Sequence, residues 1–354
     1  MKNVKLILDM PEDDYHAIPA LSASGIKLLN TGPLDYWHKI YGPGKSESGT
    51  RAQMNGSAKH KAALEGVEKL REKYTPALDK TMFDDVLDSH DDLKTWCKRH
   101  DLKVGGTKKV LCERIAEYCE SSGINTPALW PTLTQDYAAD ATDSGKTILT
   151  QNEYADALEK SKQSAQIVGP LRDSGGHPEV TILWEDGGIS CKARLDFLAP
   201  GIVLDLKNVA NKNCVPFREC CHSEIGRRMM TVQAEWYLRA ARIAQGAKLL
   251  PFDYDGDFTF QWLFMQSSGT PNILVRDYEQ KKEDIERPGK FVRTDISTRS
   301  ASVITDAISA YSHFMSKFGT DTPWVTELDH AAMRDVDYPS WYLYDPGEAE
   351  IEFD

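Results

Sequence analysis

The sequence predicts an α/β protein with a mixed central sheet flanked by helices and with a small helical insertion. One observation is a run of three strands, separated by glycine-containing turns, at residues 180–184, 189–197 and 202–206. A second observation is helical periodicity on both sides of this run, at residues 49–66 and 229–244. The third is a basic helical hairpin within residues 84–123, which such a sheet core does not need.

The other elements follow in order along the chain. Serine-capped and proline-started helices are predicted at residues 22–29 and 33–41, and a further helix at 150–168 is expected to pack behind the sheet. Strands at 258–266 and 272–277 extend the sheet, and a helix at 297–318 closes it. Residues 126–145 and 208–226 are predicted connections, and the scattered aromatics at 324–341 indicate no chemistry. We divide the chain into a helical part of the core (1–83), the insertion (84–123), the main core (124–343) and an acidic tail (344–354).

Composition narrows the class of protein. With 354 residues, 41% hydrophobic and 27% charged, the chain has room for one or two globular domains. It has no apolar run of membrane-spanning length and no signal-peptide core near Met1, so we expect a cytoplasmic protein whose seven cysteines are reduced thiols. The net charge of −12 argues against a general nucleic-acid coat protein. Part of the excess lies in residues 345–354, which hold five acids and no base and are expected to be solvated.

The insertion has a charge opposite to that of the chain. Residues 93–115 read as helix, glycine turn and helix, with Thr107 as the second N-cap, and carry seven bases against two acids. This pattern resembles the SAP motif, a small module that binds duplex DNA. The resemblance implies DNA contacts from five bases: Lys98, Arg99, Lys103, Lys108 and Lys109. We expect a small core of seven apolar residues: Leu93, Trp96, Leu102, Val104, Val110, Leu111 and Ile115. The alternative is a solvated hairpin that serves as a spacer or oligomer contact, and the acids at 84–92 are read as linker.

Polar residues interrupt the strands where apolar ones are expected. Asp196 lies near the end of the second strand, and Asp205 and Lys207 share a face of the third because they are two residues apart. Burying such charges is costly unless they are paired, and a divalent metal would pair the carboxylates. An exposed salt bridge at a strand end is the alternative. The spacing resembles the core of the PD-(D/E)XK nucleases; Leu195 stands where their name has proline, which removes no ligand.

Five ordered motifs make the resemblance more specific. They are Leu-Ser-Ala-Ser-Gly at 21–25, Arg-Ala-x-x-x-Gly-x-x-x-His at 51–60, Lys-Ala-Arg-x-Asp at 192–196, Asp-Leu-Lys at 205–207 and Val-Gln-Ala-x-x-Tyr at 232–237. Together they resemble the RecE-type (exonuclease VIII) family of phage and prophage DNA exonucleases.

The resemblance implies a role for each matching residue. His60, ambiguous when read alone, becomes a ligand of Mg²⁺, for which Mn²⁺ can substitute, and the other ligands are Asp196, Asp205 and the backbone carbonyl of Leu206. Lys207 would orient the attacking water. Gln233 and Tyr237, one helical turn apart, would border the site, and Glu179 would assist through a metal-bound water. Candidate phosphate contacts outside the insertion are Arg51, Lys212, Arg218, Arg227 and Arg228.

The implied activity is digestion of linear double-stranded DNA from its 5′ end, which leaves 3′ single-stranded tails for recombination. The resemblance also implies a homo-oligomeric ring, a single-strand annealing partner and a bacterial cytoplasm. One alternative is a RecB- or Cas4-like nuclease that acts on single strands, disfavoured because no iron–sulfur cysteine set appears. Another is a non-enzymatic SAP-type DNA-binding protein with a degenerate core. The group Cys214, Cys220, Cys221 and His222 fits no zinc spacing.

Overall fold

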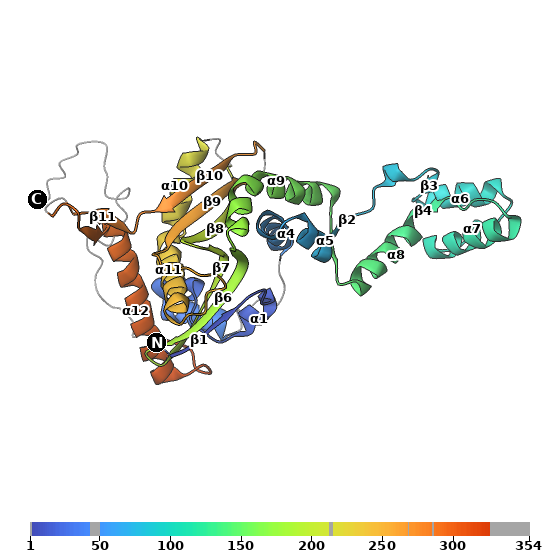
Figure 1. Cartoon of the computed structure of the whole chain (residues 1–354). Coiled ribbons are helices and arrows are strands. Elements are labelled where there is room, and N and C mark those ends of the chain that lie inside the picture. The colour runs from blue at the N-terminus through green and yellow to red at the C-terminus, as the bar shows by residue number, and fades with distance from the viewer. Residues whose placement is uncertain (1, 43–49, 212–214, 268, 285–286, 326–354) are drawn as a thin grey trace, which may run out of the picture.

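The computed structural model describes residues 2–42, 50–211, 215–267, 269–284 and 287–325. Its central sheet has the strand order β1-β6-β7-β8-β9-β10 (Figure 1). The strands are β1 (Lys2–Ile7), β6 (His177–Asp186), β7 (Ile189–Ala199), β8 (Ile202–Val209), β9 (Thr259–Gln266) and β10 (Ile273–Tyr278). All neighbours are antiparallel except β8 and β9, which are parallel, so the predicted mixed sheet is confirmed. The edge strand β1 was not predicted.

Helices cover both faces of this sheet. On one face lie α2 (Ala23–Thr31), α11 (Met230–Gly246) and α12 (Asp295–Phe318), which share a large apolar core with β6 and β7. On the other face α4 (Arg51–Glu65) and α9 (Gln151–Asp173) pack on Phe197, Leu204 and Leu263. Along β8, Val203 belongs to the first core and Leu204 and Leu206 to the second, as the alternation of a strand requires. Asp205 therefore points towards α11.

Shorter elements complete the body. They are α1 (Glu12–Ala17), α3 (Pro33–Ile40), α5 (Val67–Lys73), α10 (Phe217–Arg227) and the strand pair β11 (Lys281–Glu283) and β12 (Phe291–Arg293). Residues 208–226 were predicted to be a polar, cysteine-rich connection, and most of its second half forms helix α10. That helix follows Pro216 and buries Cys221 in the core, so tertiary packing outweighs its polar composition. Among the described residues no helix is long and apolar enough to cross a membrane.

An arm projects from the body between β2 (Tyr74–Pro76) and β5 (Thr147–Leu149), which pair in parallel at its base (Figure 1). It contains the 3₁₀ turn η1 (Lys80–Met82), β3 (Val86–Leu87), α6 (His90–Arg99), α7 (Lys108–Ser122), β4 (Ala128–Leu129) and α8 (Trp130–Asp143). β3 pairs with β4, which closes the helical hairpin into a unit. Helix α8 falls in the predicted connection 126–145. Pro131 stands in its first turn, where proline starts a helix rather than breaking it.

The arm has its own core. Leu93, Leu111 and Ile115 are buried as predicted, and Thr107 caps α7 by accepting a hydrogen bond from the Val110 amide. Val104 and Val110 were predicted to be buried, but they are 42% and 39% exposed; Val104 lies in the inter-helix loop, and Val110 stands in the first turn of α7.

The acids at 84–92 were predicted to be linker, but the last of them belong to the first helix of the arm hairpin. Asp91 and Asp92 form the first turn of α6, and Asp92 completes a capping box with Ser89. The acidic tail, Lys212, Cys214 and all but the first two residues of 324–341 lie outside the described residues.

Gly176, between α9 and β6, makes the close approach of these elements possible. A Cβ there would lie 2.6 Å from Phe197 Cε1 and 2.5 Å from the carbonyl oxygen of Leu171. We expect Gly176→Ala to lower the free energy of unfolding by about 1–3 kcal/mol. Gly169, within α9, has open space around it, so Gly169→Ala should raise that free energy by about 0.5–1 kcal/mol. Urea unfolding of both variants checks this, and a Gly176→Ala protein as stable as wild type would contradict it.

Candidate active site

Three carboxylates form a row across β6, β7 and β8. The β6–β7 register places Glu179 opposite Asp196, because the pairs on either side of them are Pro178–Phe197 and Val180–Leu195. One step beyond the last β7–β8 pair, Phe197–Leu204, Asp196 faces Asp205. The sheet therefore brings together acids that are 17 and 9 residues apart in the sequence.

The row lies where β7 and β8 separate. Their ladder ends at Phe197–Leu204, and beyond it the backbone amide of Leu206 donates to the Asp196 carboxylate at 2.7 Å. A side chain thus takes the place of the neighbouring strand as hydrogen-bond acceptor. Because the N–H and C=O of one strand residue point to the same side, the Leu206 carbonyl faces the same gap.

His60, from α4, bridges two of the carboxylates. Its Nε2 lies 2.9 Å from Asp196 Oδ2 and its Nδ1 lies 3.2 Å from Glu179 Oε1. Burial alone would lower the pKa of His60, but the two carboxylates outweigh burial and raise it from 6.5 to about 10. Burial alone would raise the pKa of Asp196. The positive charges of His60 and Lys207 outweigh burial, so this pKa is lowered. A raised pKa favours the imidazolium form of His60, in which Nε2 can donate to Asp196 and Nδ1 forms an ion pair with Glu179.

Asp205 is fully buried and paired with Lys207 of the same strand. Lys207 Nζ donates a hydrogen bond to Asp205 Oδ1 at 2.7 Å. It lies 2.6 Å from Asp205 Oδ2, but the angles there do not suit a hydrogen bond. Burial raises the pKa of Asp205, and the Lys207 ammonium only partly offsets this. Burial alone would lower the pKa of Lys207, but the neighbouring carboxylates outweigh burial and raise this pKa. Both groups therefore depend on each other to remain charged.

Helices α11 and α2 complete the surroundings of Asp205. Gln233 donates from Nε2 to Asp205 Oδ1 at 2.8 Å, and Lys27 Nζ lies 3.4 Å from Gln233 Oε1. Tyr237, one turn on from Gln233, is buried, and burial raises its pKa well above the usual value. Burial also lowers the pKa of Lys27 to about 8. Lys27 was not singled out from the sequence as a site residue. The feature that could have indicated it is a lysine on the apolar side of a serine-capped helix.

The donor atoms around the gap are of the kinds that Mg²⁺ and Mn²⁺ prefer: two carboxylates, a carbonyl and an imidazole. Within the described part of the chain, however, no three His, Cys, Asp or Glu side chains are arranged so that they could hold a metal ion. The contacts give the reason, because His60 is directed at the acids and Lys207 occupies Asp205. A metal here would have to replace these partners.

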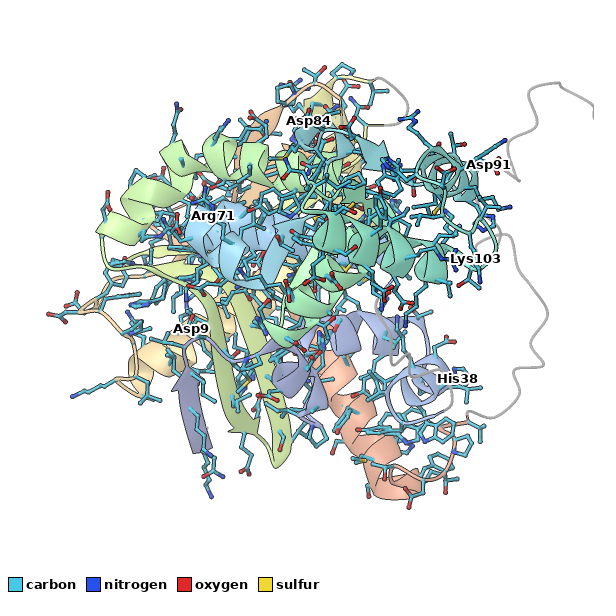
Figure 2. The ribbon with its side chains drawn as sticks, turned by 90° about the vertical axis from the view of Figure 1, so that its right-hand side faces the viewer. Asp9, His38, Arg71, Asp84, Asp91 and Lys103 are labelled. Atoms are coloured by element: carbon cyan, nitrogen blue, oxygen red, sulfur yellow. The ribbon has the colours of Figure 1, made fainter. Side chains whose placement is uncertain are left out.

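The predicted DNA contacts fall into two groups. In the body, Arg51 is ion-paired with Glu153 of α9, and Arg227 and Arg228 both lie 2.5 Å from Glu224. In the arm the predicted bases Lys98, Arg99, Lys103, Lys108 and Lys109 are all exposed. Arg114 donates to the carbonyls of Lys103 and Gly105 and so fixes the loop between the helices. Figure 2 looks along the arm onto the body, and Asp91 and Lys103 mark the arm in that view.

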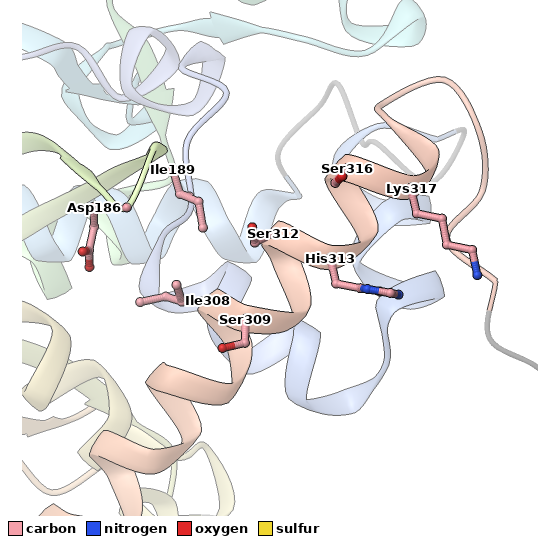
Figure 3. Close-up of a pocket in the computed structure, with 9 residues that line it drawn as sticks. Asp186, Ile189, Ile308, Ser309, Ser312, His313, Ser316 and Lys317 are labelled. Carbon is pink, nitrogen blue, oxygen red and sulfur yellow. The ribbon is translucent and has the colours of Figure 1, made fainter.

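Two pockets lie away from these residues. A pocket of about 700 Å³ opens between the β6–β7 turn and α12 (Figure 3) and is lined by Asp186, Gly187, Ile189, Ile308, Ser309, Ser312, His313, Ser316 and Lys317. A second, of about 450 Å³, is lined by Glu235, Arg239, Arg242, Ile243, Arg293, Ala301, Ile304 and Thr305. Neither is lined by a predicted site residue, so the carboxylate row is the candidate active site on chemical grounds.

Comparison with known families finds a match in the helical hairpin of the arm. The family model of the SAP domain matches residues 89–119, which confirms the predicted SAP-like segment. No curated protein matches the sequence. A similar solved structure is that of a protein from Eubacterium rectale described as a "Putative exonuclease", with 12% identity, a TM-score of 0.41 and 85% of each chain covered.

The bridging role of His60 predicts a pH-dependent contribution to stability. Because its pKa is higher in the folded protein than the ordinary 6.5, the contribution is complete below that pH and is lost as the pH rises towards 10. In EDTA at pH 6, we expect His60→Gln to lower the free energy of unfolding by about 2–3 kcal/mol. The difference from wild type should shrink between pH 7 and pH 10. His313→Gln, at an exposed site on α12, is the control, and a difference that does not change with pH would contradict the bridge.

Proposed function

We propose that this protein is a metal-dependent exonuclease that degrades linear double-stranded DNA. The observation that carries the proposal is the convergence of Asp196, Asp205 and Lys207 at the gap between β7 and β8. A buried acid, a partly exposed base and a second acid held by a backbone amide suit phosphodiester hydrolysis, since they combine metal-ligand oxygens with a fixed ammonium. Digestion from the 5′ end and the production of 3′ tails for recombination rest on the RecE-type motifs.

The chain's own residues have separate tasks in this proposal. Asp196, Asp205, His60 and the Leu206 carbonyl would hold Mg²⁺, which lowers the pKa of water and neutralises charge on a phosphate when it is bound. Lys207 would orient the attacking water. Gln233 holds Asp205 in place through its amide, and Lys27 fixes the orientation of that amide.

The arm would bind duplex DNA ahead of the site. Its exposed bases stand on a unit with its own core, so they can contact phosphates without disturbing the sheet. Lys108 and Lys109 begin α7, where the helix dipole adds to their attraction for a phosphate. A homo-oligomeric ring and a single-strand annealing partner are proposed from the family resemblance alone.

A SAP-type DNA-binding protein without catalysis is the second candidate, and the SAP match at residues 89–119 favours it. It gives no reason for burying Asp205 beside Lys207, because a pair of this kind is seldom more stabilising than apolar residues of similar volume. A nuclease acting on single strands shares the site chemistry and differs only in substrate.

The nuclease proposal is tested with linear duplex DNA labelled at the 5′ or the 3′ end. We expect the 5′ label to be released first in Mg²⁺ and not in EDTA. Asp205→Asn and Lys207→Met should each lower the rate by roughly 10²–10³-fold, because each removes a group that acts on developing charge. Asp277→Asn, on β10 of the same sheet, is the matched control. Intact DNA that wild-type protein still shifts in a gel would leave the binding-protein alternative, and faster degradation of single-stranded DNA would favour the single-strand nuclease.

The arm is tested separately by duplex binding at several salt concentrations. Lys108→Ala with Lys109→Ala should weaken binding and reduce the slope of log K against log salt by about one for each phosphate that is no longer neutralised. Lys162→Ala, which removes an exposed lysine from α9, is the control. An unchanged slope would rule out phosphate contacts by these two residues.

A further inference from the structure

Glu179 adopts a backbone conformation that its residue type disfavours. It lies within β6 with a φ of +53°, in the left-handed region that non-glycine residues rarely enter. The β6–β7 ladder skips this position and resumes at Val180. Such a conformation persists only where the surroundings impose it, and it often marks a site where a side chain must point in one direction.

The two carboxylate oxygens of Glu179 have different partners. Oε1 lies 3.2 Å from Nδ1 of His60, and Oε2 accepts from Nε of Arg194 at 2.5 Å. All three side chains are largely buried, with exposed fractions of 25% for His60, 15% for Glu179 and 18% for Arg194. Glu179 therefore links the guanidinium to the imidazole.

Arg194 also lies close to helix α1. It stands on β7 two residues before Asp196, and its guanidinium lies 6.0 Å from the ring centre of Tyr15 in α1. Lys192, on the same strand, fixes α1 by donating to the carbonyls of Tyr15 and Ile18 at 2.8 Å each. Helix α1 therefore lies against the guanidinium, whose Nε is directed at Glu179.

We propose that Arg194 and Glu179 are positioning residues that fix the ring of His60 towards Asp196. Arg194 orients Glu179, and Glu179 pairs with Nδ1 at 3.2 Å, so that Nε2 is the nitrogen presented to the gap. An imidazole without such a partner can rotate and exchange tautomers, and partners of this kind are what orient histidine ligands of metals. This inference rests on the proposed function for the use of the site. It gives Glu179 a role different from assistance through a metal-bound water, and it adds Arg194.

The test measures Mn²⁺ binding by calorimetry in the absence of DNA, using the full chain. Glu179→Gly relieves the left-handed strain but removes the acceptor, so we expect a folded protein that binds Mn²⁺ roughly 10–100-fold more weakly. Glu179→Gln keeps an oxygen acceptor, and its affinity should fall by less. Arg194→Lys keeps the charge without the fixed fork of the guanidinium, and its affinity should fall between those of wild type and Glu179→Gly.

A matched control comes from the same strand. Asp186, also on β6, is ion-paired with Arg239, so Asp186→Asn breaks a comparable pair away from His60 and should bind Mn²⁺ as wild type does. The ¹⁵N shifts of the His60 ring at fixed pH give a second readout, and they should change in Glu179→Gly but not in Asp186→Asn.

Each outcome decides between the two proposals. Wild-type affinity and unchanged ring shifts in Glu179→Gly would overturn the positioning role, as would an equal fall in affinity in Asp186→Asn. If wild type binds Mn²⁺ and Glu179→Gly does not, but DNA remains intact, the nuclease proposal fails and the positioning role stands. If wild type binds no Mn²⁺, the positioning role is overturned even where DNA is cleaved.

Discussion

The hydrogen bond from the Leu206 amide to the Asp196 carboxylate is the contact on which the site depends. An amide at the end of a buried ladder must find an acceptor, and here the acceptor is a side chain. The two strands can therefore separate without leaving a buried donor unpaired. The gap that results admits His60 from α4, while Gln233 of α11 reaches Asp205 from the other side of the sheet. If β7 and β8 paired along their full length, the Leu206 amide would donate to the β7 backbone, and the Asp196 carboxylate would lose this partner.

The local sequence pattern predicts the strands and the face on which each side chain lies. It does not predict the contacts that depend on how one strand pairs with the next. The three central strands follow from alternating apolar residues, and the shared face of Asp205 and Lys207 follows from their spacing alone. The left-handed backbone at Glu179 and the pairing of Arg194 with it depend on register and on α1, which no local pattern encodes. For this reason Arg194, two residues from a predicted ligand, was not singled out.

The same distinction holds for helices. The arm hairpin was predicted because Thr107 caps α7 and its apolar residues recur at helical spacing. Helices α8 and α10 were missed because proline and polar residues were read as breaks, whereas Pro131 starts one helix and the burial of Cys221 stabilises the other. Arg51, a predicted DNA contact, is ion-paired with Glu153 and so joins α4 to α9. It therefore stabilises the helix that carries His60.

Charge balance explains how three acids can share one row. Glu179, Asp196 and Asp205 face three bases, Arg194, His60 and Lys207, and each acid lies within 3.2 Å of at least one of them. A divalent cation entering the gap would add positive charge beside three acid–base pairs whose formal charges already cancel, with Lys27 near Asp205 as a further base. Binding would then favour release of a proton from the group, and His60 is the member whose deprotonated form is a metal ligand. Metal affinity at such a site should therefore rise with pH, because the imidazolium that stabilises the metal-free protein competes with the metal for the same carboxylate.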